Sequence, residues 1–406
     1  MSSRVWYEHP AVRWVLPIAP ADIEARDERG WTPLMRVAGS APNPEAVGVL
    51  LGAGADIEGR DDGGLTPLMI AAGLNANPDV LQALLRAGAD LEARDEVGLT
   101  PLMQGAALNA NPDVVRVLLH AGANLEARND HGHTPLMIAV DGNQNPEVLR
   151  VLLQAGAGLE ARDEAGWTAL MLAAHGVENP EVIRALLNAG ANAATSHEEG
   201  WTPLTLAARQ NGNPDVVRAL LHAGADVESH SEGGYTALMH AAGKNPNPDV
   251  VRVLLDAGAD TGARSEEGWS PLTTAALNEN SEVARVLLSA GAEVDSRDDH
   301  GWTQLTHAAA TNANPDVVRV LLDAGAELET RDDYGWTPLM FAAARSEATE
   351  VVRVLLDAGA EVNACNSNGM TALTLAMNGN ANPNPFVLRL LLKAGARPAL
   401  GVIWRG

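Results

Sequence analysis

Cysteine is almost absent from this sequence of 406 residues, in which Cys365 is the single example. One thiol excludes an intramolecular disulfide and a multi-cysteine zinc site, and it fits a reducing compartment. Long apolar runs are absent too, since none approaches the roughly 18 residues needed to span a bilayer. The N-terminal stretch carries Arg, Glu, His and Pro where a signal peptide needs an unbroken apolar run. We therefore expect no membrane partner and a cytoplasmic location, with secretion that needs no classical signal peptide left open.

Positive charge is scarce. The chain has 28 Lys and Arg against 52 Asp and Glu, which gives a formal net charge of -24. Phosphate backbones and anionic lipids are attracted by clusters of Lys and Arg. This balance argues against direct nucleic-acid binding and favours a neutral or basic protein partner.

Aromatic side chains are few as well, with nine Trp, three Tyr and two Phe. Six of the tryptophans nevertheless follow one kind of glycine, in "GWTPL" and its close copies. That glycine recurs every 34 residues, apart from one interval of 33 between Gly268 and Gly301. Such a fixed period indicates a repeat architecture. The turn glycines are Gly30, Gly64, Gly98, Gly132, Gly166, Gly200, Gly234, Gly268, Gly301, Gly335 and Gly369.

Each unit contains signals for two helices. In the unit that begins at Gly98, Thr100 and the proline after it predict an N-cap and a first helical turn. Asn111 and its proline repeat this device, and Gly122 predicts the end of the second helix. The unit is therefore expected to fold as a short helix followed by a second helix.

A single unit should not be stable alone. The second helix, "VVRVLLHA", is apolar on most sides, and only Arg116 and His120 form a polar stripe. Such a helix must be covered on more than one face. About ten large apolar side chains contribute roughly 20 kcal/mol, whereas ordering the unit costs about 1–2 kcal/mol per residue. We therefore expect a one-dimensional solenoid in which neighbouring units stabilise one another.

The pattern "G-x-T-P-L-M-x-A-A" followed by "N-P-D-V-V-R-V-L-L-x-A-G-A-D" resembles the ankyrin repeat over nearly the whole chain. Met or Thr stands where the family usually has His, and one extra residue precedes Asn-Pro. The resemblance implies an all-α repeat solenoid of ankyrin-like stacked helix pairs with β-hairpin fingers. Fingers and inner helices would then form a concave face.

The glycine spacing also divides the chain into segments. We expect a capping half-repeat at 1–29, ten tandem repeats at 30–368, and a C-terminal repeat with its cap at 369–406. Eleven helix pairs would follow the half-repeat. Five side chains are expected to cover the two ends of the stack: Trp6, Tyr7, Val402, Ile403 and Trp404.

The residue after each turn glycine is the first candidate for partner binding. The resemblance places it on the concave side of a finger, where the fold does not demand tryptophan. Trp combines a large apolar area with an N–H donor, which is typical of interface anchors. The alternative is a purely structural ladder in which each ring packs on the next finger. The candidates are Trp31, Trp167, Trp201, Tyr235, Trp269, Trp302 and Trp336.

A second row of candidates is the arginine of the finger motif Glu-Ala-Arg and its variants. Residues two apart in an extended finger share a face, so we expect the two charges to pair. The arginines could also recognise carboxylates of a partner. The row is interrupted at Ser196 and His230. Its candidate binding residues are Arg94, Arg128, Arg162, Arg264, Arg297 and Arg331.

The sequence gives little support for metal binding or catalysis. His197, His222, His230 and His240 occupy different offsets in repeats that lie about 10 Å apart, so they should not converge on one ion. The sequence has no G-x-x-x-x-G-K, G-x-S-x-G or H-E-x-x-H motif. We predict no catalytic residue, no metal and no cofactor.

The leading hypothesis is therefore a non-enzymatic, monomeric scaffold that binds a protein or an extended peptide on its concave face. One alternative is an acidic mimic of nucleic acid, or a secreted effector, that sequesters a basic protein. Another is a structural spacer or a designed consensus array. The 33-residue interval and the irregular stretch "RSEATE" favour a natural, diverged array.

Overall fold

The computed structural model describes residues 11, 22–143, 145–345, 348–378 and 383–398. They belong to two units, Met1–Ala193 and Ala194–Gly406. Eleven helix pairs and no strand are present in this described part of the chain, which confirms the all-α repeat fold. The predicted end covers at Trp6, Tyr7, Val402, Ile403 and Trp404 lie outside it, as does most of the predicted half-repeat.

The first unit contains five helix pairs. Its helices are α2 (Pro33–Ser40), α3 (Glu45–Gly52), α4 (Pro67–Leu74), α5 (Pro78–Arg86), α6 (Pro101–Leu108), α7 (Pro112–His120), α8 (Pro135–Gly142), α9 (Pro146–Gln154), α10 (Ala169–Gly176) and α11 (Pro180–Asn188).

The second unit contains six pairs and one short 3-10 turn, η2 (Glu232–Gly234). Its helices are α12 (Pro203–Gln210), α13 (Pro214–His222), α14 (Ala237–Lys244), α15 (Pro248–Asp256), α16 (Pro271–Ala275), α17 (Ser281–Ser289), α18 (Gln304–Thr311), α19 (Pro315–Asp323), α20 (Pro338–Ala343), α21 (Thr349–Asp357), α22 (Ala372–Asn378) and α23 (Pro385–Lys393).

The helices begin where the capping signals predict. The hydroxyl of Thr100 accepts a hydrogen bond from the backbone N–H of Met103 at the start of α6. The side chain of Asn111 accepts from the N–H of Asp113 at the start of α7. These bonds satisfy N–H groups that the first helical turn leaves without partners. The same devices start nearly every pair, so helix boundaries are set locally.

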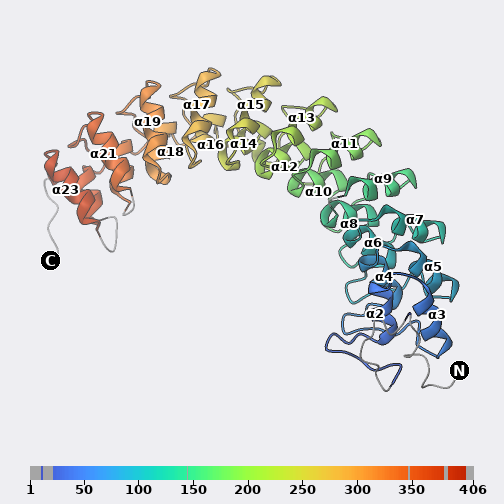
Figure 1. The fold of residues 1–406 in the computed structure, drawn as a ribbon. Helices are drawn as coiled ribbons and strands as arrows, with labels where there is room; N and C mark the ends of the chain where they lie inside the picture. Colours follow the sequence, from blue (N-terminus) through green and yellow to red (C-terminus); the bar gives the residue numbers. More distant parts are fainter. Residues whose placement is uncertain (1–10, 12–21, 144, 346–347, 379–382, 399–406) are drawn as a thin grey trace. The chain divides into compact units, whose positions relative to one another are not determined.

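Within each unit the helices form two rows. In the first unit α2, α4, α6 and α8 lie side by side as inner helices, and α3, α5, α7 and α9 form the outer row (Figure 1). Even-numbered helices are likewise the inner ones in the second unit. Leu102, Met103, Val114 and Leu118 of one pair are at most 1% exposed, so the core lies between the rows and between neighbouring pairs.

Asparagines that follow the last residues of the inner helices join successive repeats, and most of them are buried. Nδ2 of Asn109 donates to the carbonyls of Ala72 and Asn75 in the preceding repeat, at 2.8 and 2.9 Å. Its Oδ1 accepts from the backbone N–H of Asn111. One side chain thus bonds to two carbonyls of the preceding repeat and to the backbone N–H of the residue that caps the outer helix of its own repeat. The same arrangement occurs at Asn75, Asn143, Asn245, Asn278 and Asn312.

The fingers are tight turns, and the β-hairpin form that the resemblance implied is not seen in the described residues. A typical finger is closed by two backbone bonds, from Asp95 N to the Leu99 carbonyl and from Gly98 N to the Asp95 carbonyl. One isolated antiparallel bridge, between His230 and Thr236, is the nearest approach to a ladder. Gly98 has φ +78°, and a Cβ there would lie 2.5 Å from Oδ1 of Asp130 in the next finger. Glycine therefore permits both the turn and the close stacking of fingers.

The 33-residue repeat has a shortened inner helix. α16 ends at Ala275 after five residues, whereas α14 and α18 each have eight. The inter-repeat asparagine of this unit, Asn278, keeps both of its carbonyl partners. The missing residue is therefore absorbed at the end of α16, on the side of the inner helices.

Candidate functional site

The finger charges bind the backbone of the next repeat. NH1 of Arg128 donates to the carbonyl of Gly132 at 2.9 Å and to that of Arg162 at 2.5 Å. The carboxylate of Glu126 accepts from the N–H of Gly158 in the next finger. The predicted pairing of Glu126 with Arg128 is thus wrong, because both side chains find backbone partners along the stack. A charge-assisted bond to a fixed carbonyl outweighs an exposed ion pair.

The other candidate arginines follow this scheme. Each donates to the carbonyl of its own turn glycine, and most also reach the finger that follows: Arg94, Arg162, Arg264, Arg297 and Arg331. The row therefore has an architectural use. Whether it also contacts a partner stays a prediction.

The residues after the turn glycines are half-buried, and in the second unit all of them except Met370 belong to a row of rings. His240, His307 and Phe341 from the inner helices supply the remaining rings. His240 lies between Trp201 and Tyr235, with ring centroids 4.6 and 5.9 Å away. We call this set the ring row: Trp201, Tyr235, His240, Trp269, Trp302, His307, Trp336 and Phe341.

Rings of the fingers and rings of the inner helices alternate in this part of the ring row. His307 lies between Trp269 and Trp302, at 4.9 and 5.0 Å. Phe341 lies between Trp302 and Trp336, at 4.5 and 4.9 Å. A finger ring is therefore held by a ring of its own inner helix and by one from the next repeat. Aromatic pairs at these separations add about 0.5–1.5 kcal/mol beyond area burial.

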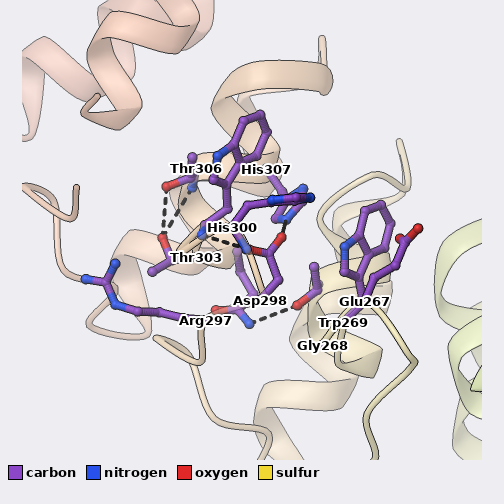
Figure 2. Close-up of polar contacts among 12 residues, drawn as sticks. Glu267, Gly268, Trp269, Arg297, Asp298, His300, Thr303, Thr306 and His307 are labelled. Atoms are coloured by element: carbon purple, nitrogen blue, oxygen red, sulfur yellow. Dashed lines mark hydrogen bonds and ion pairs between the residues drawn. The ribbon is translucent and has the colours of Figure 1, made fainter. Parts of the chain in front are cut away.

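His307 is oriented by the finger beneath it. Its Nε2 lies 2.7 Å from Oδ2 of Asp298, both residues are buried, and Oδ1 of Asp298 accepts the backbone N–H groups of His300 and Trp302 (Figure 2). Burial lowers the pKa of His307 more than the carboxylate of Asp298 raises it. The contact is therefore a hydrogen bond donated by a neutral imidazole, which fixes the ring under Trp269 and Trp302.

His240 occupies the corresponding place two repeats earlier. Its Nε2 lies 2.8 Å from Oγ of Ser231, which stands where other fingers have aspartate. Burial and the nearby guanidinium of Arg209 lower the pKa of His240 to about 4. The ring is therefore neutral at physiological pH and acts as a packing surface.

A pocket of about 450 Å³ opens beside His240. Trp201, Tyr235 and Trp269 form its aromatic walls, and His240 and Thr274 also line it. Its origin is visible in the ring row. α16 has Thr274 where α14, α18 and α20 have His240, His307 and Phe341, so the ring between Tyr235 and Trp269 is missing. The neighbouring Gly243 carries no side chain to fill the gap.

The rim of the pocket is basic on the helix side and acidic on the finger side. Arg209 and Lys244, from the last turns of α12 and α14, line the helix side. Glu232 lines the finger side, and the hydroxyl of Tyr235 donates to Glu267 at 3.3 Å. Three successive fingers here have lost the aspartate found in most others. The substituted positions are His197, Ser231 and Ser265.

The candidate rings of the first unit make fewer ring contacts. Nε1 of Trp31 donates to Oδ2 of Asp61 in the next finger at 3.0 Å, and Arg29 lies 5.8 Å over its ring. Trp167 makes an edge contact with His175 at 5.2 Å. Leu74 and Leu108 at the ends of inner helices are more than half exposed. The structure thus brings the second unit's candidates into one row, whereas Trp31 and Trp167 each contact other residues of the first unit.

The geometry suits binding better than chemistry. Ser231 and His240 are at the distance of a nucleophile and its base, but Ser231 is only 3% exposed. An imidazole with a pKa of about 4 is also a poor general base at neutral pH. Among the described residues no group of three or more His, Cys, Asp or Glu could hold a metal ion. In that same part of the chain, no helix combines the length and apolarity that crossing a membrane requires.

Reading the sequence in single motifs missed His307, Phe341 and the pocket. A periodic signal for them existed. The sixth residue after the turn glycine is a ring in three repeats and Thr274 in the repeat between two of them. The interruption of the arginine row at Ser196 and His230 lies in the same section of the chain as the pocket.

Comparison with known families agrees with this geometry. A family model described as ankyrin repeats (3 copies) matches residues 5–95, 68–163, 143–231, 210–298, 238–332 and 305–400. A search of curated proteins gives no match. Ankyrin repeats generally mediate protein–protein interaction, and proteins built from them are typically non-enzymatic. With stacked helix pairs, turn fingers and family matches from residue 5 to residue 400, the chain belongs to the ankyrin repeat family.

Proposed function

We propose that this protein is a binding scaffold that holds a protein or an extended peptide against the ring row of its second unit. One observation carries the proposal. A stack of rings, most of them half-buried, borders an open pocket of about 450 Å³. Pockets of this size lined by aromatic side chains and a few polar groups are typical of binding sites.

Half-buried tryptophan is suited to this role because its fixed ring gives contact area at low entropic cost. Trp201 and Trp269 line the pocket, and Trp302 continues the row beyond it. The remaining candidates of the second unit, Tyr235 and Trp336, extend the same surface. Trp31, Trp167 and the finger arginines are secondary candidates on this proposal.

The test is affinity capture from lysate of the source cells with the full chain and two variants. Trp201→Ala/Trp269→Ala should reduce recovery of captured proteins by well over tenfold, because truncated interface tryptophans often cost about 2 kcal/mol or more each. Leu118→Ala, a core change in the first unit, should lower stability and leave capture by folded protein unchanged. Equal recovery with both variants would show that the proposed face is not the binding face.

A second function is favoured by the net charge of -24. An acidic array could occupy a basic nucleic-acid-binding protein, in its own cell or as a secreted effector. Capture that disappears at moderate salt, and that survives loss of Trp201 and Trp269, would support this alternative. Salt-resistant capture that needs both tryptophans supports the ring-row proposal.

A further inference from the structure

The pocket beside His240 lies where one ring of the ring row is missing. The missing ring indicates the shape of a group that would fill the pocket. Within the ring row, an inner-helix ring lies between Trp201 and Tyr235, and another between Trp269 and Trp302. Between Tyr235 and Trp269 the corresponding residue is Thr274, and the two finger rings meet edge-on at 6.3 Å. The space left over is open to solvent and lined by aromatic side chains. At about 450 Å³ the pocket has room for a planar apolar group from outside the chain.

The rim adds a preference for charge. Arg209 and Lys244 line the pocket, and neither has an ion-pair partner in the described part of the chain. Outer-helix arginines behave differently, because Arg218 and Arg252 each pair with an aspartate three residues earlier. The chain has only two lysines, Lys244 and Lys393, so a lysine at this rim is unusual for this sequence.

Helix-dipole compensation does not account for these two cations. A basic residue in the last turn stabilises any helix, so dipole effects alone would favour one throughout the inner row. The inner helices α2, α4, α6, α8, α16, α18, α20 and α22 have none. Arg209 and Lys244 occur in consecutive repeats at the one pocket with a missing ring. The fingers of this section carry Ser231 and Ser265 where most other fingers have aspartate.

We infer that the pocket binds an aromatic side chain of a partner segment, with a carboxylate next to that side chain held by Arg209 and Lys244. The inference rests on the proposed function and adds the chemistry of the bound segment. The guest ring packs against Tyr235 and Trp269, which line the pocket together with Thr274. The acidic finger side, with Glu232 and Glu267, repels a carboxylate and so orients the segment. An overall acidic protein thus carries a locally anion-selective site.

The carboxylate has two sources with the same chemistry, an acidic side chain adjacent to the aromatic residue or the C-terminus of the segment. Both present two acceptor oxygens to the guanidinium of Arg209 and the ammonium of Lys244. Synthetic peptides with free and amidated ends separate the two sources. If amidation abolishes binding, the terminus is the ligand, and if binding survives, the side chain is.

The probe is a random library of 12-residue peptides selected on the immobilised full chain. Selected peptides should share an aromatic residue next to a carboxylate. Replacing either group in a selected peptide, by Ala or by the neutral amide, should weaken its binding about tenfold or more. Arg209→Gln/Lys244→Gln should weaken binding of the unaltered peptide by a similar factor. The matched control, Arg218→Gln/Arg252→Gln, removes the same charge from the outer helices of the same repeats and should change little.

A second variant tests the missing ring. Thr274→Phe supplies from within the chain the ring that the partner would supply, so it should abolish peptide binding while the helical circular dichroism is kept. If Thr274→Phe does not fold, the rim variant decides alone, because Arg209 and Lys244 are half-buried and exposed and are not part of the core.

The outcomes separate this inference from the function on which it rests. Selected peptides without the aromatic–carboxylate pair, or peptides that bind Arg209→Gln/Lys244→Gln as tightly as the unaltered chain, overturn the inference. The proposed function survives that result if Trp201→Ala/Trp269→Ala loses the same peptides. Peptides that bind the tryptophan variant undiminished overturn the proposed function as well, whereas a library that gives no binder overturns the inference alone.

Discussion

Asn143 donates a hydrogen bond from Nδ2 to the backbone carbonyl of Asn109, 2.8 Å away in the preceding repeat. It donates a second to the carbonyl of Ala106 at 2.9 Å, and its Oδ1 accepts from the N–H of Asn145. One repeat later the same position is Val177, whose side chain has neither donor nor acceptor. A pocket of about 530 Å³ lies at this junction, lined by Val140, Asn143 and Val177. The series of inter-repeat amides is therefore broken between α8 and α10.

Val177→Asn should stabilise the first unit. The new amide can reach the carbonyls of Val140 and Asn143 in the way that Asn143 reaches those of Ala106 and Asn109. Two buried hydrogen bonds at about 0.5–1.5 kcal/mol each, less the cost of ordering the side chain, predict a gain of about 1 kcal/mol. Urea unfolding of the full chain, with amide hydrogen exchange of α8 and α10 as a local probe, measures it. Val177→Thr, which matches the valine in shape and lacks an amide, is the control and should show no such gain.

Capping asparagines should also have two separable effects. Oδ1 of Asn111 caps α7, and its Nδ2 donates to the carbonyl of Ala76 in the preceding repeat. Asn111→Ala loses both and should cost about 1–2 kcal/mol in urea unfolding, as should Asn314→Ala, where the same two bonds occur. Asn111→Asp keeps the cap and loses the donor. A destabilisation by Asn111→Asp of about half the alanine value would separate the two roles, and no effect would assign the whole cost to the cap.

The helices could be predicted from the sequence because their signals are local. Thr100 and Asn111 each act within three residues, so a 34-residue pattern suffices to place the helix starts. The partners of Arg128 could not be predicted, because its bond to the carbonyl of Arg162 depends on the distance between stacked fingers. The ring row could be predicted in part. Its finger rings were recognised, whereas His307 and Phe341 needed a comparison of one position across all repeats.

Arg128 tests whether the arginine row supports the stack. Its NH1 bonds to the carbonyls of Gly132 and Arg162 tie two fingers together. Arg128→Ala should therefore lower the free energy of unfolding by about 1–2 kcal/mol. Arg116→Ala removes an equally charged residue whose exposed partner is Asp113 within the same helix, and should cost less than about 0.5 kcal/mol. If both variants lower the free energy of unfolding by the same small amount, the arginine row does not support the stack, and only the partner-binding interpretation is left.

His240 should make the second unit sensitive to acid. Its pKa is about 4 in the folded chain, below its ordinary value of 6.5, so the unfolded chain binds more protons between these two pH values. The stability that comes from the neutral imidazole is complete above pH 6.5 and is lost as the pH falls toward 4. The difference in unfolding free energy between the natural chain and His240→Gln should shrink over that window by roughly 1–3 kcal/mol. Every other titratable group is present in both proteins, so its contribution cancels in this difference. An NMR titration that gives His240 an ordinary pKa would remove the basis of the prediction.

The tryptophans should differ in what they contribute to stability. Trp302 is held between His307 and Phe341 at 5.0 and 4.5 Å, whereas Trp201 contacts one ring, His240, and the guanidinium of Arg209 at 5.2 Å. Trp302→Ala should therefore cost about 2–3 kcal/mol in urea unfolding, and Trp201→Ala about 1 kcal/mol.

A core control sets the scale, since Leu254→Ala leaves a cavity at a residue that is fully buried and should cost about 2–5 kcal/mol. If both tryptophan variants lose as much stability as the core control, the rings are structural along the whole row. The surface beside His240 would then have no tryptophan available to bind a partner. If Trp201→Ala stays close to the natural chain while losing peptide binding, the row has a structural part around Phe341 and a binding part around the missing ring. That division follows from the packing, because Trp302 is held between two rings, whereas Trp201 lines the open pocket.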